Sequence, residues 1–206
     1  MTRKYTIQPM HPAAGVDAGM PPRRSGREVF LMLRTAAFTA LLLLFGLVAT
    51  GLAGGPAAGR NPLDPDGRLH IGNEDRCPVC AMLPIRYPRF AAAIELLDGR
   101  TYYFCSPGCM LKAWLHPDIF LDTQASQLKR PVILEYFSGE ALDARAVYWV
   151  SGSDVVGPMG PALVPLKNAT HLEAFRRRHG AKHVFRMDEL THDNWEALTG
   201  KQPPQG

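Results

Sequence analysis

The chain has 206 residues, which is enough for one compact domain with an additional segment but too few for two large domains. Hydrophobic residues make up 46% of the chain, an ordinary fraction for a globular protein, and the formal net charge is +4. The whole excess of positive charge lies before residue 60, whereas residues 60–206 carry equal numbers of acidic and basic side chains. A neutral domain has no electrostatic basis for binding DNA or RNA, so the composition excludes a nucleic-acid partner.

An apolar run without charged residues occupies residues 35–53. As a helix it is about as long as the hydrocarbon core of a bilayer is thick, which predicts a transmembrane anchor. The basic residues within 1–34 predict a cytoplasmic N-terminus and a periplasmic domain, by the positive-inside rule. A cleaved signal segment is the alternative, since small residues follow the run. The Gly- and Pro-rich residues 54–68 are predicted to be a linker, residues 69–200 the globular domain, and residues 201–206 a disordered tail.

The first half of the domain shows signals for a hairpin and a helix. Strand-forming residues at 90–97 and 100–104 flank an Asp-Gly pair, the strongest short signal for a two-residue hairpin turn. A short helix is predicted over residues 107–114, because a proline opens it and a His-Pro pair follows it.

The second half repeats this order of signals. It is predicted to contain a strand pair, a helix, a strand and a last helix, at residues 132–137 with 146–150, 170–178, 182–187 and 191–198. A capping box from Thr170 to Glu173 opens the first of these helices, and Gly180 follows its end. The predicted fold class is therefore α+β, with two β-hairpin–helix units in one small domain, preceded by an N-terminal transmembrane helix.

All four cysteines of the chain lie in two close pairs, Cys77 with Cys80 and Cys105 with Cys109. The C-x-x-C spacing of the first pair lets two thiolates bind one tetrahedral ion. The second pair opens a predicted helix, whose dipole lowers the pKa of nearby thiols and favours the metal-binding thiolate. Soft thiolates select Zn, Cu(I) or Fe–S clusters. The pattern predicts a metal site, with a disulfide framework or a redox-active C-x-x-C as alternatives.

Methionines close to the cysteines favour copper over zinc. Met82 and Met110 each follow a cysteine within two residues, and a thioether suits Cu(I) but is rare on Zn. Core packing is the alternative role for both. Met159 lies in a Gly-Pro-Met-Gly turn that offers little core to fill, and His116 precedes a proline at a predicted helix end. Both join the candidate ligands, although His116 also suits a helix cap or a surface position.

No motif for a nucleophilic hydrolase, a zinc protease or a phosphate-binding loop occurs in the sequence. The chain is therefore predicted not to be an enzyme.

Several of these segments resemble the NosL family. They are Cys-Pro-Val-Cys-Ala-Met at residues 77–82, the stretch from Tyr-Trp-Val-Ser-Gly to Gly-Pro-Met-Gly-Pro within 148–161, and Phe-Arg-Arg-Arg-His-Gly leading into a strand within 175–185. The resemblance covers most of residues 74–190. A second, shorter resemblance, over about residues 76–121, is to YHS/TRASH metal-binding domains.

The NosL resemblance implies a Cu(I) chaperone for nitrous oxide reductase assembly, with a copper-acceptor protein or maturation complex as its partner. It places Cys80 and Met82 on the family's Cys-Gly-Met motif. Ala81 replaces the glycine of that motif, so no easy positive φ is expected there. The lipobox cysteine is absent, which leaves the apolar run as the expected tether. The additional pair of Cys105 and Cys109 keeps open a zinc- or disulfide-stapled interaction module without metal transfer.

Overall fold

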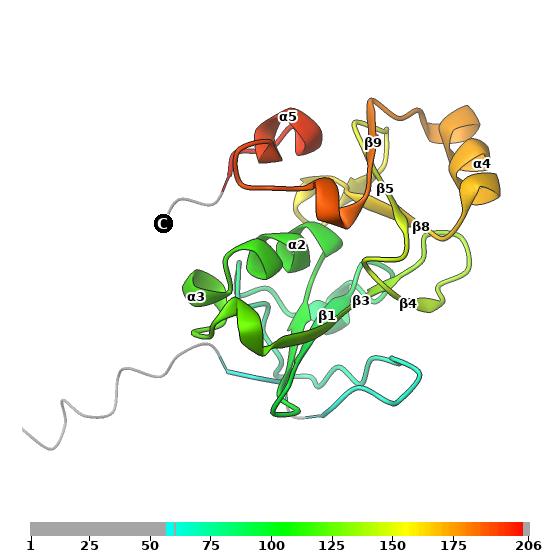
Figure 1. Ribbon diagram of the computed structural model, residues 1–206. Helices are drawn as coiled ribbons and strands as arrows, with labels where there is room; N and C mark the ends of the chain where they lie inside the picture. The colour runs from blue at the N-terminus through cyan, green and yellow to red at the C-terminus, as the bar shows by residue number, and fades with distance from the viewer. Residues whose placement is uncertain (1–56, 60, 204–206) are drawn as a thin grey trace, which may run out of the picture. The chain divides into compact units, whose positions relative to one another are not determined.

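A computed structural model describes residues 57–59 and 61–203, which belong to one compact unit (Figure 1). The predicted cytoplasmic segment, residues 1–34, and the predicted transmembrane helix, residues 35–53, lie outside the described residues. Within the described part of the chain, no helix is both long enough and apolar enough to cross a membrane.

The first sheet has four strands in the order β2-β1-β3-β4, each antiparallel to its neighbours. These strands are β1 (Ala92–Leu96), β2 (Thr101–Phe104), β3 (Leu128–Leu134) and β4 (Ala141–Asp143). The predicted hairpin is confirmed, with Ala92 opposite Phe104 and Gly99 at a φ of +87° in the turn. A left-handed conformation of this kind favours glycine, which explains the Asp-Gly pair.

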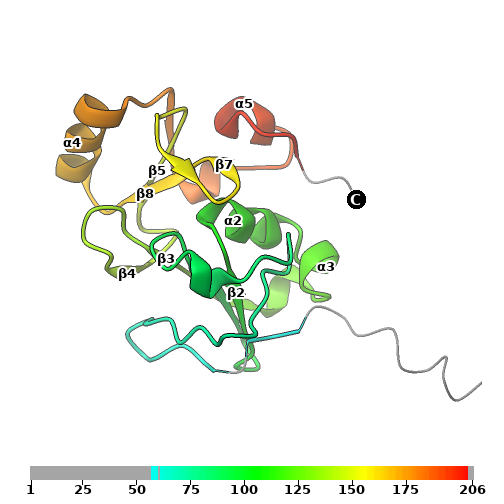
Figure 2. The ribbon, with the colours of Figure 1, turned by 180° about the vertical axis from the view of Figure 1, so that it is seen from behind.

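Both faces of this sheet are covered, so β1 and β2 are buried along their whole lengths. Successive side chains of a strand point to opposite faces. Ile94 therefore joins the main core on the side of helix α2 (Pro107–Leu115), while Ala93 packs on the other side against Leu63. This second side is covered by the segment that precedes residue 72, drawn in cyan in Figures 1 and 2.

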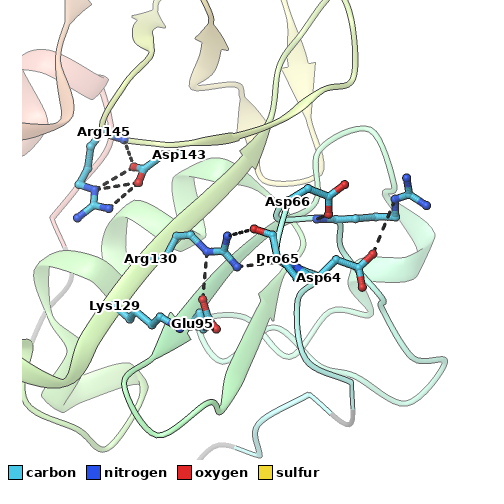
Figure 3. A network of polar contacts seen from close by, with 9 residues as sticks. Asp64, Pro65, Asp66, Glu95, Lys129, Arg130, Asp143 and Arg145 are labelled. Atoms are coloured by element: carbon cyan, nitrogen blue, oxygen red, sulfur yellow. Dashed lines mark hydrogen bonds and ion pairs between the residues drawn. The ribbon is translucent and has the colours of Figure 1, made fainter.

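Polar contacts also hold this N-terminal segment to the sheet (Figure 3). The Arg130 guanidinium on β3 donates to the carbonyl oxygens of Pro65, at 3.0 Å, and Asp64, at 3.2 Å. Its Nε donates to the Glu95 carboxylate at 3.0 Å. Residues 61–68 were predicted to be part of a linker. They contain no helix or strand, but they pack against the domain, because Gly and Pro disfavour regular secondary structure without preventing side-chain and backbone contacts.

The second sheet has three antiparallel strands in the order β8-β5-β9. They are β5 (Tyr148–Ser151), β8 (Val164–Leu166) and β9 (His183–Phe185), and a small ribbon of β6 (Val156–Gly157) and β7 (Gly160–Pro161) lies between β5 and β8 in sequence. The predicted pairing of residues 132–137 with 146–150 is wrong, since these segments belong to β3 and β5 in different sheets. The three-residue β4 pairs with β3 instead, and it is too short to give a strand signal.

The remaining elements are short except for α4 (Ala169–His179), which packs on β8. They are helices α3 (Pro117–Phe120) and α5 (Trp195–Thr199) and the 3-10 turns Pro84–Arg86, Ala125–Gln127 and Met187–Glu189. Helix α4 confirms the predicted helix and its end at Gly180, but its cap is Asn168, whose side chain accepts from the His171 N–H at 2.8 Å. The predicted capping box at Thr170 is therefore two residues late.

The domain contains two units with one topology. In each, two antiparallel strands are followed by a helix, and a third strand returns to the free side of the first: β1-β2-α2-β3 and β5-β8-α4-β9. The predicted first hairpin–helix unit thus gains a third strand, β3. In the second unit β8 replaces residues 132–137 as the partner of β5, and β9 confirms the strand predicted at residues 182–187. The result is a small mixed α/β domain with antiparallel sheets.

Helix α2 joins the two units through the main core, and it lies between the two sheets in both views (Figures 1 and 2). Its Met110 belongs to the same buried cluster as Phe104 of the first sheet and Trp149 of the second. Trp195 of α5 completes this cluster and is fully buried. The N-terminal end of α2 is consequently held from both sides.

Candidate metal centre

The four cysteines meet in one cluster, as their paired spacing predicted. All four Sγ atoms lie within 4.8 Å of one another. The Cys80 and Cys105 sulfurs are 3.3 Å apart, and those of Cys105 and Cys109 are 3.9 Å apart. Two thiolates on one tetrahedral ion are separated by about 3.8 Å, given metal–sulfur bonds of about 2.3 Å. Small side-chain rotations therefore suffice for all four sulfurs to bind a single soft ion.

A tight loop positions the first cysteine pair. The Cys77 carbonyl accepts from the Ala81 N–H at 2.8 Å, and the Cys77 N–H donates to the Met82 carbonyl at 2.9 Å. These two bonds turn the chain back within six residues and direct both thiols inward. Ala81 adopts a φ of +60°, which corrects the expectation that replacing the family's glycine removes this conformation. The loop keeps the glycine-like backbone and retains the associated strain.

The second pair lies where strand β2 passes into helix α2. Cys105 directly follows the strand, and Ser106 caps the helix by accepting from the Cys109 N–H at 3.2 Å. Pro107 occupies the first turn, where its fixed φ and missing N–H are tolerated. The cap orients the backbone of Cys109 so that its thiol points to Cys105, at the positive end of the helix dipole.

Burial separates Cys80 from the other three cysteines. Cys77, Cys105 and Cys109 are 1%, 0% and 4% exposed, whereas Cys80 is half-buried. Contacts from the Cys105 and Cys109 thiols lower the pKa of Cys80 below its ordinary value. Contact with the Cys105 thiol raises the pKa of Cys109, which therefore ionises later. Contact with the Cys105 thiol also lowers the pKa of Cys77, so the cluster favours the thiolates of the first pair, which includes the least buried cysteine, Cys80.

Met159 lies beside this cluster rather than inside it. It occupies the exposed turn between β6 and β7, at 44% exposure, and it lines a pocket of about 390 Å³ that Cys109 also lines. The pocket reaches Val79, between the first two cysteines, and Lys201 in the predicted disordered tail. Lys201 donates to the Met159 carbonyl at 3.1 Å, so this part of the tail is held against the domain.

Met82 and Met110 have different surroundings. Met82 is half-buried at the end of the cysteine loop. Met110 is fully buried in the main core, where its neighbours are apolar side chains of both units. Burial in the core favours a packing role for Met110, and the accessible thioethers are those of Met82 and Met159.

His116 lies at the opposite end of α2 from the thiols. It caps the C-terminus of the helix, seven residues beyond Cys109, which corresponds to about 10 Å along the axis. It is absent from the cluster of metal-ligating atoms found in the described residues. Its Nε2 lies 3.2 Å from Nδ1 of His192. Burial and the neighbouring imidazole lower the pKa of His116.

Sequence reasoning missed two groups near these residues. His192 was not proposed, because a lone histidine between polar residues carries no local signal and its partner is 76 positions away. Lys112 and Lys201 line the pocket at Cys109, and only the fold brings them together. One signal in the sequence could have identified Lys112. It follows Cys109 by three residues, so the two side chains lie on the same face of the predicted helix.

The fold and the four-thiol cluster together define the class of this chain, a small protein for binding a soft metal. Comparison with known proteins identifies the family within this class. The NosL family model matches residues 68–195, and the chain belongs to this family. The copper-binding lipoprotein NosL of Stutzerimonas stutzeri is 30% identical over 155 residues, which cover 73% of this chain and 77% of that protein.

A solved structure supports the fold. The copper chaperone NosL from Shewanella denitrificans matches 63% of this chain and 99% of its own, with a TM-score of 0.53 and 22% identity. One relative is named as a copper-binding lipoprotein and the other as a copper chaperone, and neither as an enzyme, which agrees with the absence of catalytic motifs from the sequence.

Proposed function

We propose that this protein carries Cu(I) outside the cytoplasm and delivers it to an acceptor during assembly of nitrous oxide reductase. Residues 35–53 are its proposed membrane tether. The observation that supports the proposal best is the cluster of four thiols within 4.8 Å, in which Cys80 is the least buried cysteine. The family membership supports copper as the cargo.

A carrier must hold its ion and also release it, and the cluster suits both steps. The three buried cysteines keep water away from the ion and retain it. Cys80 is accessible, so a soft ligand of the acceptor can approach there and replace the Cys80 thiolate before the remaining bonds break. The exposed Met159 supplies a neutral soft donor along the same pocket.

Charge around the pocket also favours bound thiolates. Several thiolates on one Cu(I) ion carry a net negative charge, and the pocket beside Cys109 is lined by Lys112 and Lys201. Burial and the charge of Lys112 lower the pKa of Lys201, while the interaction with Cys109 acts in the opposite direction. In the metal-free protein the surroundings of Lys201 disfavour its charged form. The negative charge of metal-bound thiolates would stabilise that ammonium group, and the ammonium group would in turn stabilise the bound thiolates.

A zinc-stapled interaction module is the second candidate. It is favoured by the number of thiols, because four thiolates close the tetrahedral shell of a structural zinc ion. The 3.9 Å separation of the Cys105 and Cys109 sulfurs matches that shell.

Methionine variants distinguish copper delivery from zinc stapling. In the full chain, reduced and loaded without oxygen, replacing Met82 and Met159 with Leu is expected to weaken Cu(I) binding about tenfold and to leave Zn(II) binding unchanged. Competition against a Cu(I) chelator and a Zn(II) chelator measures the two affinities. Met110→Leu is the matched control, because this side chain is buried in the core and its replacement should alter neither affinity.

Unchanged Cu(I) affinity in the double variant would remove both methionines from the copper site. A reduced chain that binds Zn(II) but not Cu(I) would favour the structural module. A reduced chain that takes up neither metal would exclude both candidates.

A further inference from the structure

A pair of histidines lies at the opposite end of α2 from the cysteines. His116 Nε2 and His192 Nδ1 are 3.2 Å apart, and the two rings meet edge to face with their centroids 5.0 Å apart. His116 is half-buried and His192 is exposed, so solvent reaches the pair. We propose that His116 and His192 form a second metal site, for a divalent ion such as Zn²⁺ or Cu²⁺, separate from the thiol cluster.

The distance between the two nitrogens selects the kind of ion. With metal–nitrogen bonds of about 2.0–2.1 Å, nitrogens 3.2 Å apart subtend an angle of about 100° at the ion. This value lies between square-planar and tetrahedral geometry. A linear two-coordinate ion, the arrangement in which Cu(I) binds two ligands, would need nitrogens about 4 Å apart. Neutral imidazole is also a preferred ligand of Zn²⁺ and Cu²⁺.

The backbone holds both histidines in place. His116 ends α2 by donating its N–H to the Lys112 carbonyl at 3.0 Å, and its own carbonyl accepts from Phe120 of α3 at 3.2 Å. The His192 carbonyl accepts from the N–H of Trp195 at 3.3 Å, and the Trp195 ring is fully buried. Neither histidine is on a free loop, so the ion meets a site whose spacing is already set.

The turn before α5 is fixed as well. Asn194 donates through its side-chain amide to the Glu189 carbonyl at 2.8 Å, and its Oδ1 accepts from the Thr191 N–H at 2.8 Å. The histidine pair is therefore a contact between the first ββαβ unit and the turn that precedes the last helix, α5. An ion bound there links the turn before α5 to the end of α2.

Ring-nitrogen NMR of the full chain in detergent, labelled with ¹⁵N-histidine and titrated with Zn²⁺, tests the proposal. We expect Nε2 of His116 and Nδ1 of His192 to shift together and to saturate at one ion. Zn²⁺ that enters the thiol cluster leaves both resonances in place, because the cluster lies at the other end of α2. The result is therefore independent of which metal the cysteines carry.

Substitutions complete the test. His192→Ala is expected to abolish the shift at His116 and to weaken this binding step about tenfold. His183→Ala, on β9, is the matched control and should leave the step unchanged. If neither ring nitrogen shifts at saturating Zn²⁺, or if His192→Ala binds as tightly as the unchanged chain, the pair is an ordinary hydrogen bond and the second site is excluded.

Discussion

The two ββαβ units place different chemistry at one equivalent position. In each unit the helix begins after the second strand, and a polar side chain caps it by accepting from the N–H three residues later. In the first unit Ser106 caps and Cys109 donates, and in the second Asn168 caps and His171 donates. Cys109 belongs to the thiol cluster, whereas His171 binds the buried Glu135 carboxylate at 2.8 Å.

The fold thus fixes the position of the residue three places after the helix cap, Cys109 or His171. The residues around it determine the chemical role of its side chain. The first unit adds the loop of residues 77–82, which brings two more thiols. In the second unit the neighbour is Glu135, which directly follows β3 and whose side chain is fully buried. Its carboxylate also accepts from the backbone N–H groups of Phe137 and Ser138, at 3.0 and 2.7 Å. One position belongs to the proposed metal site, and the other is expected to support stability.

The largest expected effect follows from removing the thiol of the first unit. Loss of a group that only supports a metal ligand costs 10–100-fold in affinity, so Cys109→Ser, which removes a ligand, should weaken Cu(I) binding by at least about 100-fold. Competition against a Cu(I) chelator measures the change.

His171→Gln is the counterpart of this variant in the second unit, and it should leave Cu(I) affinity unchanged. Equal losses in the two variants would break the comparison, since they would mean that both helix starts contribute to the metal site.

The buried carboxylate should dominate stability in the second unit. Burial opposes its charge, but hydrogen bonds from His171 and Ser138 hold the pKa of Glu135 below its usual value. A depressed carboxylate pKa contributes stability that is present above the unfolded-state pKa of about 4.3 and is lost as the pH falls through the folded-state value. Glu135→Gln should cost about 1–3 kcal/mol at pH 7 and flatten the loss of stability below about pH 4.5. Denaturant unfolding across pH measures both effects.

Glu140→Gln provides the control in the same turn. Its carboxylate pairs with Lys167 at 3.0 Å and is half exposed, so its loss should change stability by less than about 1 kcal/mol. A Glu135→Gln variant with unchanged acid sensitivity would assign the acid transition to another group.

Local signals predicted much of the first unit and less of the second. The β1–β2 hairpin and α2 follow from an Asp-Gly turn and a Pro-opened helix, which are short-range features. The pairing of β3 and β5 was predicted wrongly, because strand partners are chosen by burial across the fold and β4 is only three residues long.

The candidate site divides in the same way. The four cysteines could be predicted because C-x-x-C and C-x-x-x-C are local spacings that a turn and a helix start convert into geometry. The distance of His116 from the thiols could not be predicted, because it depends on the length and direction of α2. Its contact with His192 joins residues 76 positions apart, and no sequence pattern encodes that separation.

The smallest effect is expected in the cysteine loop itself. Ala81 has a φ of +60°, a conformation that costs a residue with a Cβ about 1–2 kcal/mol. Glycine removes this strain but loses about 0.5–1 kcal/mol through its greater freedom in the unfolded chain. Ala81→Gly should therefore raise the free energy of unfolding by about 0.5–1 kcal/mol, as measured by denaturant titration of the metal-free chain.

Asp122→Gly is the matched control, because Asp122 also has a positive φ, of 49°, and lies outside the cysteine loop. Aspartate tolerates this region better than alanine, so its gain should be smaller. Metal affinity should stay constant in both variants, since the bonds between Cys77, Ala81 and Met82 are made by backbone atoms that glycine retains. A tighter Cu(I) site in Ala81→Gly alone would show that strain in this loop is coupled to metal binding, and the first unit would then combine the two roles that the comparison assigns to separate units.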